Sequence, residues 1–321
     1  MINSQVASIV VLAAALAACS PGGSIDIGSG QRPDPGSVDF PIAYVKRTLP
    51  DFRNEDVRNL RTFVVDADIY VRDRADSSVP ERNITQSITN NGQYDIRDLD
   101  VSFDGTKLVF AMRGPLVVNG DEEDQPKWAI WEYTFATRQL RRVIASNLIA
   151  SEGHDVAPHY LPSGDIVFTS TRQRASKAVL IDEGKAQFEA QTEDDREPAF
   201  VLHAMRSDGG NIRQLSFNQS HDMDPTVLTN GRILFTRWDQ FPGRNGLHLY
   251  TVNPDGTDLQ LHYGALSHFT GTNNTEVQFL KPREMPNGEI LALLRPFDGV
   301  DGGGDIVIID ARTYVENTQP A

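Results

Sequence analysis

Four short turns with nearly the same wording recur along the chain, and they constrain the fold more than any other feature. They read SFDGTKLVF, LPSGDIVF, LTNGRILF and MPNGEILAL, and their glycines are Gly105, Gly164, Gly231 and Gly288. These glycines lie 57 to 67 residues apart. A polar turn followed by an apolar run predicts the tight connection of two antiparallel strands. Its recurrence at similar intervals is typical of a fold built from repeated units.

A second set of segments follows these turns and completes each unit. They read KWAIWEYTFATRQLRRVI, FVLHAMRSDGGNIRQLS, LHLYTVNPDGTDLQLHY and GDIVIIDARTYVENT. Each reads as an apolar strand, a turn and another strand. A unit is therefore strand A, a tight turn, strand B, a variable loop, strand C, a turn and strand D. Four antiparallel strands per repeat predict an all-β chain folded as a β-propeller of four-stranded blades.

The two ends of the repeat region leave the closure of the ring open. Before the first turn, DFPIAYVKR and DADIYVRDRADSSVPERNIT look like strands B, C and D of a blade that lacks strand A. We therefore expect about five blades over residues 39–321, the first of them incomplete. The C-terminal TYVENTQPA offers no obvious strand to complete that blade. The chain is then either an irregularly closed five-bladed ring or the front part of a longer protein.

The N-terminal residues read as a signal and a tether. Residues 5–18, QVASIVVLAAALAA, are apolar or small, as in a secretion signal, so we expect residues 1–18 to be a signal peptide. LAAC, ending at Cys19, resembles a bacterial lipobox, and this implies a lipidated Cys19. The opening MINSQ lacks the usual basic residues, so a simple secretion signal is the alternative. Residues 19–38 are rich in Gly, Ser and Pro and predict a flexible tether.

The same resemblance implies a location. Ser20, after the cysteine, resembles the pattern of lipoproteins sent to the outer membrane. We expect the chain on the periplasmic side of the outer membrane, attached only through its lipid.

Charge and cysteine content exclude some function classes. The net charge of −14 argues against nucleic acid as a partner, because phosphate binding needs clustered Lys and Arg. Cys19 is the only cysteine, so no disulfide, thiolate metal site or c-type haem motif is expected in this chain. The cofactor, if there is one, is unknown, and a divalent metal is one possibility.

Two sets of residues carry a family resemblance. The turns SFDGTKLVF and NPDGTDLQ resemble the repeats of TolB-type propellers, periplasmic proteins that often act by binding partners. GHDVAPHYLPSGDIVFTSTRQ, residues 153–173, resembles the propeller (middle) domain of the hydrazine synthase alpha subunit and its relatives. The resemblance covers about residues 40–318 and implies the fold, whereas propellers host unrelated activities. That enzyme uses c-type haems, which need a Cys-x-x-Cys-His motif. This chain has no such motif, so the resemblance does not imply redox chemistry for it.

Strand order predicts which rim of the propeller carries function. The D-to-A links and the B–C loops lie at one rim, and the A–B turns lie at the other. The insertions fall between strands B and C, at residues 114–127, 173–199, 238–246 and 296–304. Long loops on a rigid scaffold commonly carry function, so we expect this loop-rich rim to be the working face.

Paired residues just before strand A form the first candidate site. They are His154 and Asp155, His221 and Asp222, and Tyr94 and Asp95. Converging imidazoles and carboxylates suit a polar ligand or a divalent metal, which would use His154, Asp155, His221 and Asp222. The alternative is structural: each Asp caps the turn into strand A and each His packs alongside.

Four arginines at the ends of the B strands form the second candidate: Arg113, Arg172, Arg237 and Arg295. They could grip an anionic ligand or the carboxylates of a partner. The alternative is that they pair with neighbouring Asp residues around the ring.

The leading functional hypothesis is a lipid-anchored periplasmic propeller that binds a protein partner, or serves as a scaffold, through its loop-rich rim. An enzyme is less favoured, because the chain has neither a Gly-x-Ser-x-Gly elbow nor a phosphate-binding loop. One alternative is a subunit or fragment of a hydrazine synthase alpha-like redox or metal-dependent enzyme whose haem-binding part lies elsewhere. Another is a small-molecule binder in the channel, with Trp128, Trp131 and Trp238 as candidate aromatics.

Overall fold

The computed structural model describes residues 40–48, 56–173, 177–178, 181–185, 198–241, 244–270, 275–297 and 304–310. The chain divides into two units, one of residues 1–42 and 72–80 and the other of residues 43–71 and 81–321. In the smaller unit, Asp76 Oδ1 accepts from the backbone N–H of Ser78 at 2.8 Å. The larger unit holds the repeated sheets.

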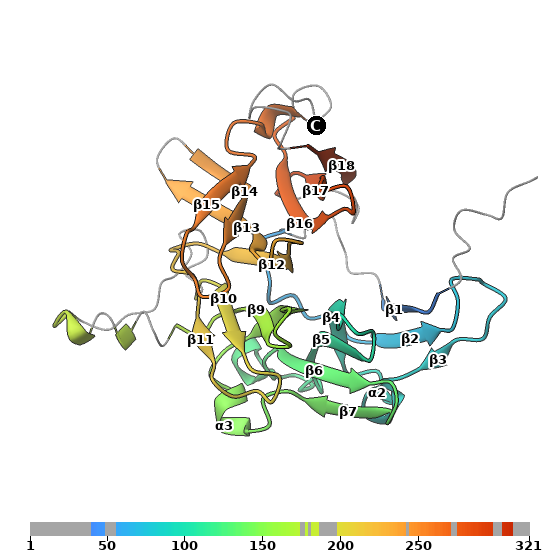
Figure 1. The fold of residues 1–321 in the computed structure, drawn as a ribbon. Helices are drawn as coiled ribbons and strands as arrows, with labels where there is room; N and C mark the ends of the chain where they lie inside the picture. Colours follow the sequence, from blue (N-terminus) through green and yellow to red (C-terminus); the bar gives the residue numbers. More distant parts are fainter. Residues whose placement is uncertain are drawn as a thin grey trace, which may run out of the picture. The chain divides into compact units, whose positions relative to one another are not determined.

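The larger unit is a five-bladed β-propeller of antiparallel sheets, as the repeats predict (Figure 1). The first blade has three strands in the order β1-β2-β3, and the next three blades have four strands each. The last blade, β16-β17-β18, has three strands in the described chain, and the expected fourth segment lies outside it. The expectation of about five blades with an incomplete first one is confirmed.

The strands of blades 1 to 3 are short. They are β1 (Ile42–Lys46), β2 (Asp68–Arg72), β3 (Arg82–Asn83), β4 (Asp95–Val101), β5 (Lys107–Arg113), β6 (Ala129–Thr134), β7 (Gln139–Arg142), β8 (Asp155–Tyr160), β9 (Ile166–Ser170), β10 (Val201–Met205) and β11 (Arg213–Gln214).

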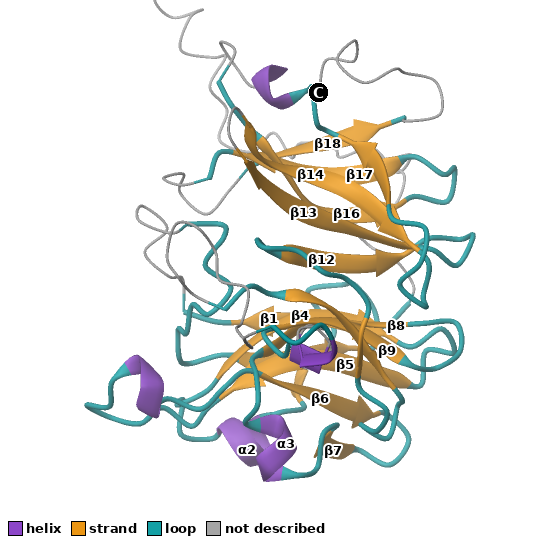
Figure 2. Ribbon diagram, turned by 90° about the vertical axis from the view of Figure 1, so that its left-hand side faces the viewer, coloured by secondary structure: helices purple, strands orange, loops and turns teal. Residues whose placement is uncertain are grey.

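Blades 4 and 5 contain the longer strands. They are β12 (Asp222–Val227), β13 (Ile233–Phe241), β14 (Arg244–Val252), β15 (Gln260–Tyr263), β16 (Gln278–Glu284), β17 (Ile290–Arg295) and β18 (Asp305–Ile309). The helical elements with described bounds are single turns between strands: α2 (Gln86–Thr89), η2 (Glu122–Asp124), α3 (Asn147–Ala150) and η3 (His268–Thr270) (Figure 2). Residues 177–178 and 181–182 are also helical.

The repeated phenylalanine of the turn phrase explains how the blades stack. Phe110, Phe168 and Phe235 lie at matching places on the B strands, and all are fully buried. Phe168 packs with Val109 of the preceding blade, and Phe235 packs with Val167 of the blade before it. Each blade therefore covers its apolar face with the next one, which is the reason a propeller needs repeated units.

The inner strands share a bulge that faces the middle of the ring. The register of β4, β8, β12 and β16 shifts at the same place in each blade. The residues at the shift are Asp98, Ala157, Asp224 and Lys281, with φ between 48° and 58°. A left-handed non-glycine residue costs of order 1–2 kcal/mol, so its repetition marks a built feature of the fold.

Candidate functional site

Asp155 and Arg172 form a buried ion pair in blade 3. Arg172 donates through Nε to Asp155 Oδ1 at 2.9 Å and through Nη2 to Oδ2 at 2.6 Å. Ser170 adds a hydroxyl bond to Oδ1 at 2.7 Å. Burial raises the pKa of Asp155, and Arg172 opposes that shift. Since every polar atom of the carboxylate has an internal partner, the pair holds the blade together.

Blade 4 repeats this arrangement with different supports. Arg237 Nε lies 3.3 Å from Asp222 Oδ1. Ser216 and Asn218 donate to the same carboxylate at 2.5 Å and 3.2 Å. Burial raises the pKa of Asp222, and Arg237 again opposes it. For these two arginines, the structure has the Asp pairing that the sequence offered as one alternative.

Blade 2 departs from that pairing. Asp95 accepts from Arg47 at 3.3 Å and from the backbone N–H of Val64 at 2.9 Å. Arg113 instead donates to Glu122 Oε1 at 2.8 Å and to the backbone carbonyl of Pro126 at 2.6 Å. Arg113 and Asp95 are directly opposite in register, so proximity alone did not decide the pairing. Of the other two candidates, Tyr94 packs against the core between blades 1 and 2, and Arg295 is buried at the end of β17.

The two candidate histidines make equivalent hydrogen bonds in successive blades. His154 Nδ1 accepts the backbone N–H of Trp128 at 3.3 Å, and His221 Nδ1 accepts that of Phe200 at 3.1 Å. Burial, reinforced by nearby arginines, lowers the pKa of His154 to about 2 and that of His221 to about 3. Both rings are therefore neutral at neutral pH. Nδ1 is the acceptor in each, so the tautomer carries its proton on Nε2.

No metal cluster is found at the rim. Within the part of the chain that the structure describes, no group of three or more His, Cys, Asp and Glu side chains is arranged to hold a metal ion. His154 and Asp155 belong to one blade, and His221 and Asp222 belong to the next. Their ring nitrogens and carboxylates point to backbone N–H groups and arginines, which is the structural alternative that the sequence left open.

Residues Asp56–Val64 form a segment that crosses the rim, which we call the strap. Its backbone meets blade 5 where Val57 N–H donates to the carbonyl of Phe297 at 2.9 Å. It meets blade 2 where Arg113 Nη1 donates to the carbonyl of Arg61 at 2.6 Å. The strap thus connects blade 2, the first blade with four strands, to blade 5, the last described blade.

Side chains of the strap also cover the middle of the rim. Leu60 packs on Trp128, Val156 and Phe200 of blades 2 and 3. The guanidinium of Arg58 lies over the rings of Trp238, 4.9 Å away, and Phe297, 4.4 Å away. Sequence reasoning missed the strap, because its residues show no strand period. The one signal was the missing strand A of blade 1, which left an apolar and basic stretch without an assignment.

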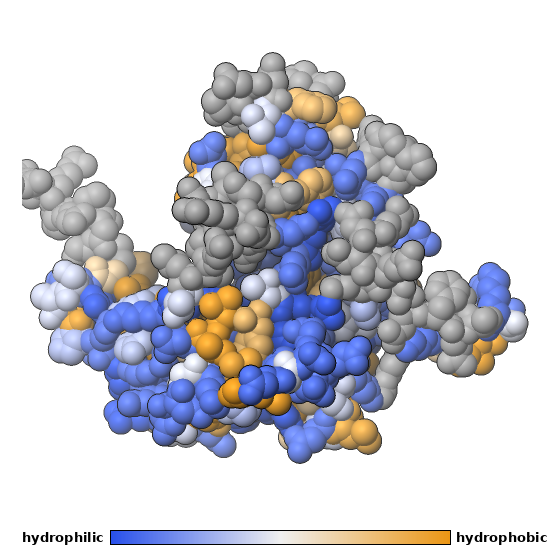
Figure 3. Space-filling model, turned by 180° about the vertical axis from the view of Figure 1, so that it is seen from behind, coloured by the Kyte–Doolittle hydropathy of each residue, from blue (hydrophilic) through white to orange (hydrophobic). Residues whose placement is uncertain are grey.

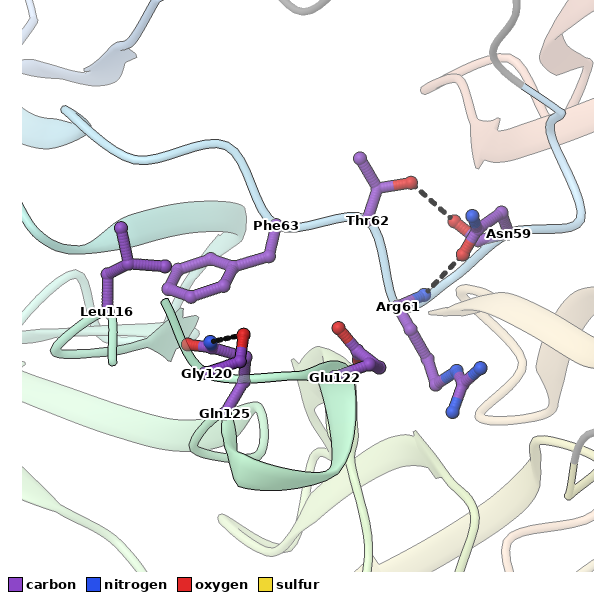
Figure 4. A pocket seen from close by; sticks show the side chains of 8 residues that line it. All are labelled: Asn59, Arg61, Thr62, Phe63, Leu116, Gly120, Glu122 and Gln125. Atoms are coloured by element: carbon purple, nitrogen blue, oxygen red, sulfur yellow. Dashed lines mark hydrogen bonds between the residues drawn. The ribbon is translucent and has the colours of Figure 1, made fainter. Parts of the chain in front are cut away.

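A pocket of about 420 Å³ lies between the strap and the B–C loop of blade 2. Phe63 and Leu116 form its apolar side, and Arg61 and Glu122 lie toward the other end (Figure 4). Gln125 closes the floor by donating to the carbonyl of Gly120 at 3.0 Å. The pocket mixes apolar and charged groups.

Charged side chains meet at the bulge of the inner strands. Lys281 Nζ lies 3.0 Å from Asp224 Oδ1 and 3.6 Å from Asp98 Oδ1, which joins blades 5, 4 and 2. Two residues after the bulge on β8 and β4, His159 Nδ1 lies 2.9 Å from Asp100 Oδ2. Lys281 therefore faces two carboxylates of opposite charge in the middle of the ring. Trp128 and Trp238, considered above for a channel ligand, are buried beneath the strap.

Comparison with known proteins supports the fold. No family model matches the chain, and no curated protein matches it. Among solved structures, Kuenenia stuttgartiensis hydrazine synthase matches at 15% identity over 81% of this chain and 36% of that chain, with a TM-score of 0.59. TolB from Acinetobacter baumannii matches at 16% identity over 77% of this chain and 53% of that chain, with a TM-score of 0.42.

A putative TolB from Agrobacterium tumefaciens matches at 14% identity over 73% of this chain and 69% of that chain, also with a TM-score of 0.42. The chain spans about a third of the hydrazine synthase chain that it matches, 36%. At such identities the likeness concerns the fold alone. The chain is a β-propeller whose fold is similar to that of part of the hydrazine synthase chain.

Proposed function

We propose that this protein is a binding module that holds a protein partner on its loop-rich rim. The supporting observation is a repeated one: each D-to-A loop from blade 2 onward carries an exposed large apolar side chain. Leu148 is 78% exposed, Phe217 is 57% exposed and Phe269 is 69% exposed. Single exposed apolar residues are ordinary on a protein surface. Their recurrence at matching loops of one rim favours a common binding surface.

Neighbouring loops extend this apolar surface. Val117 and Val118 of the blade 2 B–C loop are exposed, as are Ile149 and Leu266. The surface in Figure 3 is largely hydrophilic, with its apolar residues gathered in patches. Apolar side chains surrounded by polar ones are the pattern of a protein-binding surface. The strap beneath gives these loops a fixed base, which lowers the entropy lost on binding.

The opposite rim supplies a matched control. Its tight turns are built around Asp, Asn and Gly, and Phe103 in one of them is 70% exposed. Phe103 equals Phe217 in chemistry and exceeds it in exposure, but lies at the other end of the strands.

Photocrosslinking in cells tests the proposal. A photoreactive phenylalanine analogue replaces Phe217, Phe269 or Phe103, one at a time. We expect the same protein adduct from the first two positions and none from Phe103. The adduct formed at Phe269 should disappear when Phe217→Asp is added. Equal adducts from all three positions, or none from the rim, would refute a partner site on this rim.

We also propose that Cys19 carries a lipid that tethers the propeller to the periplasmic side of the outer membrane. The lipobox resemblance supports this, and residues 1–39 lie outside the described residues. In the described chain, no helix is long and apolar enough to cross a membrane. Metabolic labelling with an alkynyl fatty acid should mark the wild type and not Cys19→Ala. Labelling that survives Cys19→Ala would contradict the proposal.

A further inference from the structure

Blade 5 has no carboxylate at the start of its inner strand, where Asp95, Asp155 and Asp222 stand in blades 2 to 4. Asp222 stands opposite Arg237 in blade 4, and Gln278 takes the equivalent place opposite Arg295 in blade 5. With Gln in place of Asp, blade 5 lacks the negative charge of the carboxylate and keeps the positive charge of the arginine. Arg295 is nevertheless only 8% exposed, and Gln278 is fully buried.

The edge of the Arg295 guanidinium that is left without a partner among the described residues is the edge that faces the Asp in blades 3 and 4. Arg172 holds Asp155 through Nε and Nη2, and Arg237 approaches Asp222 through Nε. In Arg295, Nε and Nη2 are buried and have no hydrogen-bond partner among the described residues. This is the edge that suits the two oxygens of a carboxylate.

Gln278 stands opposite Arg295 in the strand register, and its amide oxygen is already used, so it cannot supply the missing acceptor. Its Oε1 accepts the backbone N–H of Leu247 at 2.6 Å. That bond fixes the orientation of the amide, since a flipped amide would face one N–H with another. Gln278 Nε2 is then the free end, and it too is buried without a partner in the described chain.

We propose that Arg295 and Gln278 form a buried binding site for a carboxylate at the rim of blade 5. Unmatched donors of this kind are unfavourable when buried, and more so on a charged group. Two oxygens accepting from Arg295 Nε and Nη2, with one also accepting from Gln278 Nε2, would satisfy all of them. A carboxylate fits better than a phosphate, because the place it takes is that of an Asp side chain in the neighbouring blades.

Thermal unfolding in sodium acetate or sodium formate, against sodium chloride at equal ionic strength, tests the site without any partner protein. We expect the wild-type Tm to rise by about 2–3 °C at an acetate concentration ten times its dissociation constant. Gln278→Glu provides an internal carboxylate, so it should raise Tm in chloride and abolish the acetate response. Gln139→Glu makes the same charge change on exposed β7 and should keep the response.

The source of the carboxylate is settled with the Phe217 crosslink. Loss of the adduct in Gln278→Glu, with Gln139→Glu unaffected, assigns the carboxylate to the partner protein. An unchanged adduct assigns the site to a free small carboxylate. Both outcomes are consistent with a carboxylate site at Arg295 and Gln278. The site does not require that the rim bind a protein.

Two outcomes overturn the site. The first is a wild-type Tm that acetate and formate do not shift beyond chloride. The second is an acetate response that appears only when Asp298→Asn and Asp301→Asn are combined. That response would mean that the chain's own loop carboxylates occupy the place.

Discussion

The two buried histidines make the stability of the propeller depend on pH in a calculable way. His154 and His221 are 8% and 4% exposed, and burial holds their pKa values near 2 and 3 in the folded state. An unfolded imidazole has a pKa of about 6.5. The folded pKa lies below the unfolded one, so the unfolded chain binds more protons between these values. The stability that the neutral rings provide is present above pH 6.5 and is lost as the pH falls.

The magnitude follows from the width of that window. Each pH unit below 6.5 costs about 1.4 kcal/mol per ring, so each ring loses about 2 kcal/mol of stability at pH 5 and the two together about 4 kcal/mol. The carboxyl groups of Asp155 and Asp222 act in the opposite direction, because burial raises their pKa values. Their contribution must therefore be removed by comparison with a variant.

His154→Asn and His221→Asn provide that comparison, because the Asn oxygen can take the place of Nδ1 and does not titrate. Urea unfolding of the wild type, both variants and the double variant should be measured at half-unit steps from pH 7.5 to 5. We expect the stability advantage of the wild type over each single variant to shrink by about 2 kcal/mol over this range. A difference that stays constant with pH would refute the claim that these rings are held neutral.

Three further changes test the contacts of the rim and the channel. Arg172→Met should destabilise the chain by about 3–5 kcal/mol in urea unfolding, because Asp155 would be left buried without its partner; a loss under 1 kcal/mol would contradict the ion pair. Leu60→Ala should cost about 2 kcal/mol and speed hydrogen exchange of the strap amides, whereas unchanged exchange would show that the strap does not depend on Leu60. Lys281→Met should raise the pKa of Asp98, which burial raises but Lys281 and Arg97 together hold below its usual value. The stability cost should then be present at pH 7 and fade below about pH 4, and a cost independent of pH would argue against charge pairing.

The repeats allowed the fold to be predicted from the sequence alone. Turn glycines, B-strand phenylalanines and rim arginines each recur at matching places, and local chemistry is enough to place them. The pairing partners were harder to predict. Asp222 and Arg237 pair, while Asp95 and Arg113 at the same register do not, because the strap and the blade 2 loop supply other partners. Such partners come from distant parts of the chain and leave no local period.

Departures from the repeat are therefore better guides to function in this ring than the repeated residues themselves. His154 and Asp155 of blade 3 have counterparts in blade 4, and in both blades the His accepts a backbone N–H and the Asp pairs with an arginine. Gln278 accepts the backbone N–H of Leu247 but provides no carboxylate for Arg295, whose Nε and Nη2 have no partner among the described residues. Since an unmatched buried guanidinium is unfavourable, a chain that keeps one has a compensating contact elsewhere. Blade 5 is accordingly the proposed place for a carboxylate from outside the blade, whereas blades 2 to 4 have an Asp at this position.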